Sequence, residues 1–287
     1  MGKDRNSYSK TDLEATFMRM KEDHMLNGQL KPAYNVQIAV ENYFIVHGYV
    51  SNDRTDYNTL IPVLEKHQKA FGSVLEEMTA DSGYCSEKNL LYLKEKGIES
   101  YIKLQDHEKR KTRAYAEDIS KYYNMRVEVF EDEQFYICHD GRELRHIRTE
   151  TKEQNGYTQT FEVYGCADCS GCEHKARCLY KYNAEKDTER NKVMKINEQW
   201  EELREKSHAN IQSERGILKR QTRSIQTEGH FGDIKENENF RRFNYRSADK
   251  VYKEFMLYAI GRNINKYCRF LNEKLKKFEG KTTEKTA

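Results

Sequence analysis

Between residues 34 and 104 the hydrophobic period changes repeatedly, and this order of periods restricts the fold more than any other feature of the chain. Residues 34–41 alternate apolar and polar side chains, and residues 43–50 are aromatic and β-branched, so Asn42 between them predicts an antiparallel hairpin. Helical and strand-like periods then alternate. The predicted order is strand, strand, helix, strand, helix, strand, at residues 34–41, 43–50, 56–71, 75–80, 86–97 and 99–104. This order predicts a mixed α/β layer.

The remaining sequence differs in character on the two sides of about residue 190. Residues 105–190 are charged, rich in tyrosine and contain four clustered cysteines, with short strands predicted at 126–130, 134–138 and 158–164. From residue 192 the pattern is helical, and residues 248–278 form a long amphipathic helix. A shorter helical pattern covers residues 13–20. We therefore expect three parts: a first core part at 1–104, an insertion at 105–190 and a helical second core part at 191–278.

Composition limits the class of protein. The 287 residues are 34% charged and 37% hydrophobic, but 20 Tyr and 12 Phe argue against a disordered chain. The 50 basic and 47 acidic residues permit local basic clusters that bind nucleic acid. No apolar run approaches the roughly 20 residues that span a membrane. Seven cysteines, four of them close together, favour a reducing compartment, so we expect a soluble cytoplasmic protein without a membrane partner.

Two distant carboxylates have neighbours suited to metal and phosphate chemistry. Asp81 ends an apolar run and is followed by Ser82 and Gly83, which leave a metal room to approach. Glu228 lies in a segment, residues 223–243, that is rich in Arg, Lys and His. Phosphoryl transfer on DNA needs divalent ions held by carboxylates, and Mg²⁺ prefers such oxygen ligands. The alternatives are a turn residue for Asp81 and a solvated helix charge for Glu228.

The clustered cysteines have the spacing of a metal site. They follow the pattern C-x2-C-x2-C-x5-C, which suits tetrahedral Zn²⁺. An iron–sulfur cluster and free thiols remain alternatives, although the last interval is long for the former. The four residues are Cys166, Cys169, Cys172 and Cys178. The other cysteines, Cys85, Cys138 and Cys268, are interpreted as small apolar residues.

Several of these segments together resemble the DDE transposases of bacterial insertion sequences. The resemblance rests on TADSGYCSEKN, the cysteine run, RSIQTEGHFGDIKENENFRRF with a later helix ending NINKY, and the upstream RNSYSKTDLEATFMRMKEDHMLNGQLKPAYNVQIAVE. It spans residues 6–268. It implies a ribonuclease-H-like mixed sheet flanked by helices, with an inserted Cys-rich subdomain and a helical C-terminus.

The resemblance also implies an activity and its partners. The expected reaction is metal-dependent cutting and joining of double-stranded DNA at insertion-sequence ends, by a homodimer in a synaptic complex. Asp81 would be the second catalytic acid and Glu228 the third, both holding Mg²⁺ or Mn²⁺. The Cys-rich insertion, with its proposed Zn²⁺, is similar to one in related transposases.

The segment around Glu228 matches the family's Tyr-Arg-Glu-Lys signature only in part. Lys235 stands seven residues after Glu228, as the signature requires. The arginine, Arg223, stands five residues before Glu228 instead of four, and Arg220 occupies the place of the tyrosine. Lys235 is therefore the stronger prediction for a DNA-phosphate contact, and Arg223 the weaker. Exposed helix charges are the alternative for both.

A second group of basic residues follows directly. Arg241 and Arg242 lie between Phe240 and Phe243, an arrangement suited to positioning a duplex end. The alternative is a pair of solvated arginines beside core aromatics.

The first acid of the family has no clear counterpart. It lies on a strand ahead of the hairpin, and no such strand with an Asp is predicted here. Asp12 precedes a helical pattern and is a poor substitute, and Asp53 and Asp56 fall in a loop and are poorer. The simplest hypothesis is that the chain is the C-terminal part of a longer transposase that lacks the first strand. The alternative function is a catalytically inactive DNA-binding remnant with a structural zinc module, and a weaker one is a nuclease of the same fold.

Overall fold

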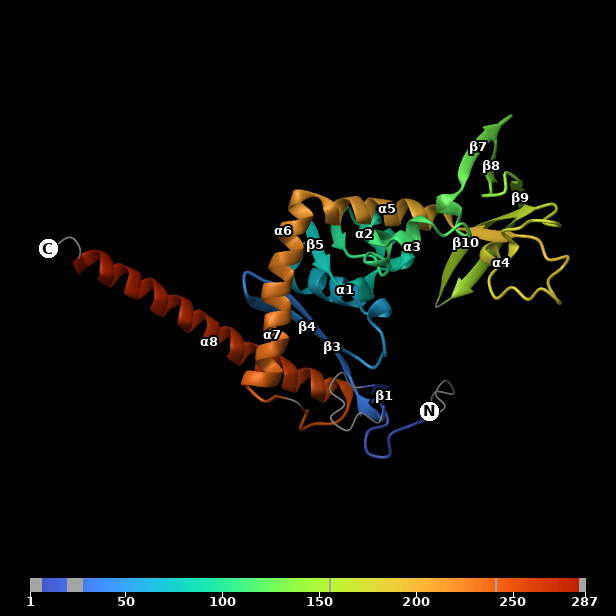
Figure 1. Cartoon of the computed structure of the whole chain (residues 1–287). Coiled ribbons are helices and arrows are strands. Elements are labelled where there is room, and N and C mark those ends of the chain that lie inside the picture. Colours follow the sequence, from blue (N-terminus) through green and yellow to red (C-terminus); the bar gives the residue numbers. More distant parts are fainter. Residues whose placement is uncertain (1–6, 20–27, 155, 241, 284–287) are drawn as a thin grey trace. The chain divides into compact units, whose positions relative to one another are not determined.

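The computed structural model describes residues 7–19, 28–154, 156–240 and 242–283, and it contains two compact units (Figure 1). The first unit consists of residues 1–102 and 210–287, and the second of residues 103–209. Both helices and strands are present, so the fold is mixed α/β as predicted. Within the described ranges, no helix is long and apolar enough to cross a membrane.

The predicted hairpin is present in the first unit. Strand β3 (Asn35–Glu41) pairs antiparallel with β4 (Phe44–Ser51). Asn42 and Tyr43 form the turn with φ values of 49° and 69°, the left-handed backbone that a tight two-residue hairpin turn requires at both positions. Asn tolerates this conformation, whereas a tyrosine rarely adopts it.

The predicted helix at residues 13–20 is wrong. The segment instead contains strand β1 (Thr16–Arg19), which pairs antiparallel with β2 (Leu30–Ala33). Thr16 and Phe17 favour strands, and Ala15 is buried at the start of β1, so tertiary pairing overrides the weak helical pattern. Pro32 lies in β2, an edge strand of a two-stranded sheet, where its missing N–H is tolerated.

The alternating part of the first unit also follows the prediction. A short 3-10 turn, η1 (Asp56–Asn58), precedes α1 (Leu60–Phe71). Strands β5 (Glu77–Ala80) and β6 (Glu99–Ile102) are parallel, and the turn η2 (Ser82–Tyr84) and α2 (Glu87–Glu95) connect them. Ser86 caps α2: its Oγ accepts a hydrogen bond from Asn89 N at 3.3 Å.

The second unit is built on a five-stranded antiparallel sheet in the order β11-β10-β9-β8-β7. Its strands are β7 (Arg126–Phe130), β8 (Glu133–Ile137), β9 (Glu143–Gln154), β10 (Tyr157–Cys166) and β11 (Val193–Ile196). Its short helices are η3 (Lys109–Lys111), α3 (Arg113–Ala116), η4 (Tyr122–Asn124) and α4 (Lys175–Cys178). The three predicted strands are present. Sequence reasoning missed β9 and β11, because β9 is mostly charged and β11 stands where a helix was expected.

The C-terminal segments are helical, as predicted. Helix α5 (Glu198–Gln212) leads into α6 (Glu214–Arg223), which continues through the π turn η5 (Ser224–Glu228), α7 (Gly229–Gly232) and a second π turn, η6 (Asp233–Asn237). Helix α8 (Ala248–Thr283) contains the predicted helix 248–278. Its residues Val251, Phe255 and Ala259 are buried, and the Asn263 side chain pairs with both Ile45 N (2.9 Å) and Ile45 O (2.8 Å) on β4.

Two helical glycines in the first unit should respond oppositely to alanine. Gly216 lies in α6 and Gly229 in α7. A Cβ on Gly216 would lie 2.0 Å from Asn210 O, whereas one on Gly229 meets nothing within 4 Å. We expect Gly216→Ala to destabilise the fold by about 1–3 kcal/mol through overpacking. We expect Gly229→Ala to stabilise it by roughly 0.5–1 kcal/mol, because alanine favours helix.

Thermal unfolding followed by circular dichroism measures both changes, and Gly229→Ala is the matched control for Gly216→Ala. An unchanged or raised Tm for Gly216→Ala would contradict the close approach of α6 to the end of α5.

Candidate active site

The two predicted acids, Asp81 and Glu228, meet at one guanidinium group. Arg223 Nη2 lies 3.7 Å from Asp81 Oδ2, and Arg223 Nη1 lies 2.9 Å from Glu228 Oε1. Both acid side chains are 58% exposed, whereas Arg223 is 21% exposed. The structure therefore brings together two acids that the sequence could only pair by resemblance, and it adds Arg223 between them.

The π turn η5 explains how Arg223 reaches Glu228. The two residues are five apart, and in an α-helix of 3.6 residues per turn they would point to different sides. A π turn bonds residue i to i+5 and so brings such residues onto the same face. Ser224 Oγ also donates a hydrogen bond to Glu228 Oε2 at 3.0 Å. The extra residue between arginine and glutamate, a departure from the family signature, is therefore absorbed by η5.

Asp81 stands at the carboxyl end of β5 and caps the turn that follows. Its Oδ1 accepts a hydrogen bond from Ser82 N at 2.7 Å, while its Oδ2 faces Arg223. The turn passes close to Asp56, because a Cβ on Gly83 would lie 2.9 Å from Asp56 Oδ2. Any larger residue at position 83 would therefore displace either Asp56 or the turn that carries Asp81.

Asp56 belongs to this site, although the sequence ranked it low. Asn35 Nδ2 and Gln37 Nε2, both on β3, donate hydrogen bonds to Asp56 Oδ1 at 2.7 Å and 2.8 Å. These amides fix the carboxylate against the Asp81 turn. In the sequence, Asp56 lies several positions after the predicted strand 43–50, in a segment without a motif. Its partners, Asn35 and Gln37, lie on β3, about 20 residues earlier, so its neighbours in sequence gave no signal.

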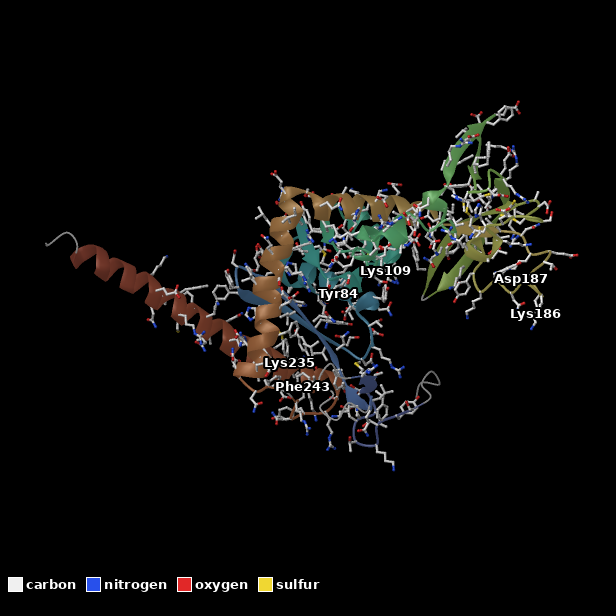
Figure 2. The ribbon with its side chains drawn as sticks, in the orientation of Figure 1. Tyr84, Lys109, Lys186, Asp187, Lys235 and Phe243 are labelled. Atoms are coloured by element: carbon white, nitrogen blue, oxygen red, sulfur yellow. The ribbon has the colours of Figure 1, made fainter. Side chains whose placement is uncertain are left out.

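Tyr84 is the last residue of η2, the turn that Asp81 caps (Figure 2). Burial raises the pKa of Tyr84, the carboxylate of Asp56 raises it further, and the charge of Arg223 opposes both effects. The Tyr84 phenol therefore stays protonated and lies within electrostatic reach of Asp56, Asp81 and Arg223. It is a neutral hydrogen-bonding group among charges.

The helix that carries Glu228 is fixed to the hairpin and to α8. His230 is buried, and its Nε2 donates to Tyr43 O at 2.9 Å, while its Nδ1 accepts from Arg262 Nη2 at 3.2 Å. Arg262 also pairs with Asp233 at 3.0 Å and with Glu238. Burial lowers the pKa of His230, the Tyr43 carbonyl opposes this, and the charge of Arg262 adds to it. His230 therefore acts as a neutral link beside Glu228.

The predicted DNA contacts lie on the same unit. Lys235 is half-buried on η6, at the end of the helical segment away from the start of α6 (Figure 2). Arg242 is exposed, and Phe240 packs edge-on against Phe243 at 5.5 Å between ring centroids. Arg241 lies outside the described residues. The contacts of these groups with DNA stay a prediction.

Asp12, the weak substitute for the first acid, has a structural role. Its Oδ2 accepts hydrogen bonds from Tyr34 Oη at 2.9 Å and from Ser247 N at 3.1 Å, next to the start of α8. These hydrogen bonds outweigh burial and lower the pKa of Asp12. Its carboxylate is occupied there, away from the partners of Asp81 and Glu228.

The donor set at Asp81 and Glu228 suits a divalent ion in chemistry but is small. Both groups are carboxylates, the ligands that Mg²⁺ and Mn²⁺ prefer, and both already converge on a cation. Across the described ranges, no three His, Cys, Asp or Glu side chains are grouped closely enough to hold a metal ion. Asp81 and Glu228 therefore fit as two ligands of such an ion, and among the described residues no third acid, Asp56 included, is close enough to complete a set of three.

The zinc prediction finds no support in the second unit. Cys166 and Cys169 are each 8% exposed and pack in an apolar core with Tyr136, Leu144 and Tyr164, as does the partly buried Cys138. Burial raises the pKa of Cys166 to about 11, as expected for a thiol in an apolar core. Cys172 and Cys178 are half-buried free thiols. Cys166 and Cys169 are thus thiols of the apolar core, whereas Cys172 and Cys178 are not part of that core.

Comparison with known proteins identifies a family for part of the chain. Residues 137–268 match the family model described as the transposase DDE domain. The match includes Arg223, Glu228 and Lys235, and it begins after Asp81. No curated protein and no solved structure matches the chain.

The buried His230 predicts a pH dependence of stability. A lowered folded-state pKa means that the unfolded chain binds the proton more readily, so the stability that His230 contributes is present above its ordinary value of 6.5 and is lost as the pH falls. We expect the Tm of the wild type to fall between about pH 7.5 and 5.5, and His230→Gln, whose amide can still donate to Tyr43 O, to show a smaller fall.

Calorimetry across this pH range compares the two proteins, with His139→Gln, an exposed histidine, as control. Equal pH dependence in the wild type and His230→Gln would show that His230 does not titrate with folding.

Proposed function

The chain carries a DDE transposase domain, and from this premise we propose that Asp81 and Glu228 are its second and third catalytic acids. The observation that carries the proposal is the Arg223 guanidinium, which lies between two carboxylates from distant parts of the sequence. The proposed reaction is metal-dependent phosphoryl transfer that cuts and joins double-stranded DNA at insertion-sequence ends.

Each residue of the site has a part in this proposal. Asp81 and Glu228 would hold Mg²⁺ or Mn²⁺, which supplies an activated attacking oxygen and charge stabilisation. The hydrogen bond from Ser82 N leaves Asp81 Oδ2 directed at the shared centre. Ser224 orients Glu228 by donating to Oε2, so Oε1 is the oxygen directed toward Arg223. Hydrogen bonds thus hold Asp81 Oδ1 and Glu228 Oε2 in place, and the other oxygen of each acid is directed toward the shared centre at Arg223.

The first unit supports the proposed ribonuclease-H-like core. It contains an antiparallel hairpin, β3–β4, followed by the parallel pair β5–β6 with α2 between its strands. In this proposal residues 1–104 and 191–278 form the two parts of the core, and residues 105–190 form the insertion. Lys235, Arg223 and Arg242 are proposed as phosphate contacts, with Arg241 beside them in sequence.

An inactive DNA-binding remnant is the second candidate. The observation that favours it is that, over the part of the chain that the structure describes, no three acids are close enough together to hold a metal ion. Such a protein would bind DNA through its basic residues without using either acid. The two candidates therefore differ in whether Asp81 and Glu228 matter to any measured property.

Substitution of the two acids tests the proposed function. We expect the protein to bind Mn²⁺, followed by electron paramagnetic resonance, and to nick plasmid DNA in its presence. Asp81→Asn and Glu228→Gln each remove one charged ligand, so each should weaken Mn²⁺ binding at least about tenfold and abolish nicking. Glu214→Gln, an exposed acid on α6, is the control and should change neither.

DNA binding measured in parallel separates the candidates. A wild type that binds DNA but neither binds Mn²⁺ nor nicks, with all three variants alike, would favour the remnant and overturn the catalytic assignment.

Arg223→Gln should produce opposite changes in metal and DNA binding. A divalent ion held by Asp81 and Glu228 competes with Arg223 for the same oxygens, so removing one positive charge at this distance should tighten Mn²⁺ binding about fivefold. The loss of a phosphate contact should weaken DNA binding and reduce the salt dependence of log K by about one.

Isothermal titration with Mn²⁺ and DNA binding at several salt concentrations give both values. Weaker binding of both ligands would instead mean that Arg223 only supports the fold of the site.

A further inference from the structure

Helix α8 has a second apolar face that no other part of the described chain covers. Five large apolar side chains on it are between 41% and 71% exposed. They are Leu257, Ile260, Ile264, Tyr267 and Leu271, here called the outer stripe. Single exposed apolar residues are ordinary on a protein surface, but a continuous row of five is a mark of an interaction site.

The outer stripe lies opposite the face that packs on the hairpin. At about 100° per residue, the buried Val251, Phe255 and Ala259 fall on one side of α8, and the stripe residues fall on the other. The helix, drawn at the C-terminal end of the chain in Figure 1, therefore has two separate apolar faces. One is used within the first unit, and the fold of that unit does not account for the other.

The spacing of the outer stripe identifies the kind of surface that fits it. Successive members are 3, 4, 3 and 4 residues apart, the a and d positions of a heptad repeat. Apolar residues repeated every 3.5 positions stay in contact along the whole length of a second helix with the same repeat. Packing against a sheet or a loop does not require this repeat, so the spacing favours a helix as the partner.

We propose that the outer stripe is a dimerisation seam, occupied by α8 of a second copy of this chain. An identical helix supplies the matching period, and a two-fold contact between identical stripes closes on itself. The proposal names the surface of the homodimer suggested above, and it does not depend on the catalytic acids.

The residues that flank the outer stripe permit two copies to approach. The flanking e and g positions are uncharged: Gly261, Asn263, Cys268 and Phe270. Like charges therefore do not face each other beside the seam, and Gly261 has no side chain to hold the helices apart. The nearby cations Arg262 and Arg269 occupy the f position, away from the seam.

The area of the outer stripe is sufficient for a weak dimer. Two facing stripes of this length would bury on the order of 1,000 Å² in total, the size at which specific interfaces begin. One flank is also fixed in place, since the Phe270 ring packs against Phe44 and Tyr43 with centroids 5.9 Å and 6.3 Å apart. We therefore expect an association in the micromolar range, with α8 already ordered before it forms.

The experiment is a mass measurement by sedimentation equilibrium on the whole chain. At ~100 μM, where a micromolar interface is populated, we expect the wild type at twice its chain mass of 34.2 kDa. Ile264→Glu places a charge in the seam and should give the monomer mass. Asn265→Glu adds the same charge to the neighbouring exposed position outside the seam and should remain dimeric.

A second substitution separates loss of the seam from loss of the helix. Ile264→Ala removes apolar area but favours helix, so it should weaken the dimer at least about tenfold while circular dichroism stays unchanged. A monomeric wild type, or dimers of unchanged affinity in both Ile264 variants, would overturn the proposal. Mn²⁺ binding by the monomeric variants should equal that of the wild type. The mass measurement therefore tests the dimer seam alone, and the proposed roles of Asp81 and Glu228 are tested separately.

Discussion

The site depends on the ion pairs that Arg223 forms with Asp81 and Glu228. Two carboxylates that converge repel each other, and the repulsion is offset only if a positive charge lies between them. Arg223 supplies that charge from a position five residues before Glu228, and Asp81 reaches it from the end of β5. The pairing is exposed and so contributes little to stability. Its importance is that it places one oxygen of each acid at a common point.

The surrounding backbone is arranged so that these two segments can meet. Gly216 lets α6 start against the end of α5, where a methyl group would overlap Asn210 O. Gly83 lets the Asp81 turn lie against Asp56, which Asn35 and Gln37 hold in place. At both positions a glycine is needed because a neighbouring group lies too close to leave room for a side chain. Residues outside the acid pair thus position the two acids.

The sequence predicted the elements whose period is strong and local. The β3–β4 hairpin, α2 with its Ser86 cap and the long helix α8 all follow from alternation, capping or helical spacing. It failed at β1 and β9, because strands of four residues or of mostly charged residues are determined by their partners. The same limit applies to the site. Local motifs suggested Asp81 and Glu228, whereas Asp56 is held by contacts with β3 that leave no local signal in the sequence.

The π turn η5 explains how an arginine and a glutamate can pair although their separation in sequence differs from the expected one. A count of residues placed Arg223 one position too far from Glu228, and this lowered its rank below Lys235. The count assumed 3.6 residues per turn, and η5 replaces that period just where the extra residue stands. An inserted residue in a helix shifts every later side chain by about 100° unless a π turn absorbs it. Because η5 absorbs it between the two residues, the charges of Arg223 and Glu228 still meet although the residues are five apart in sequence.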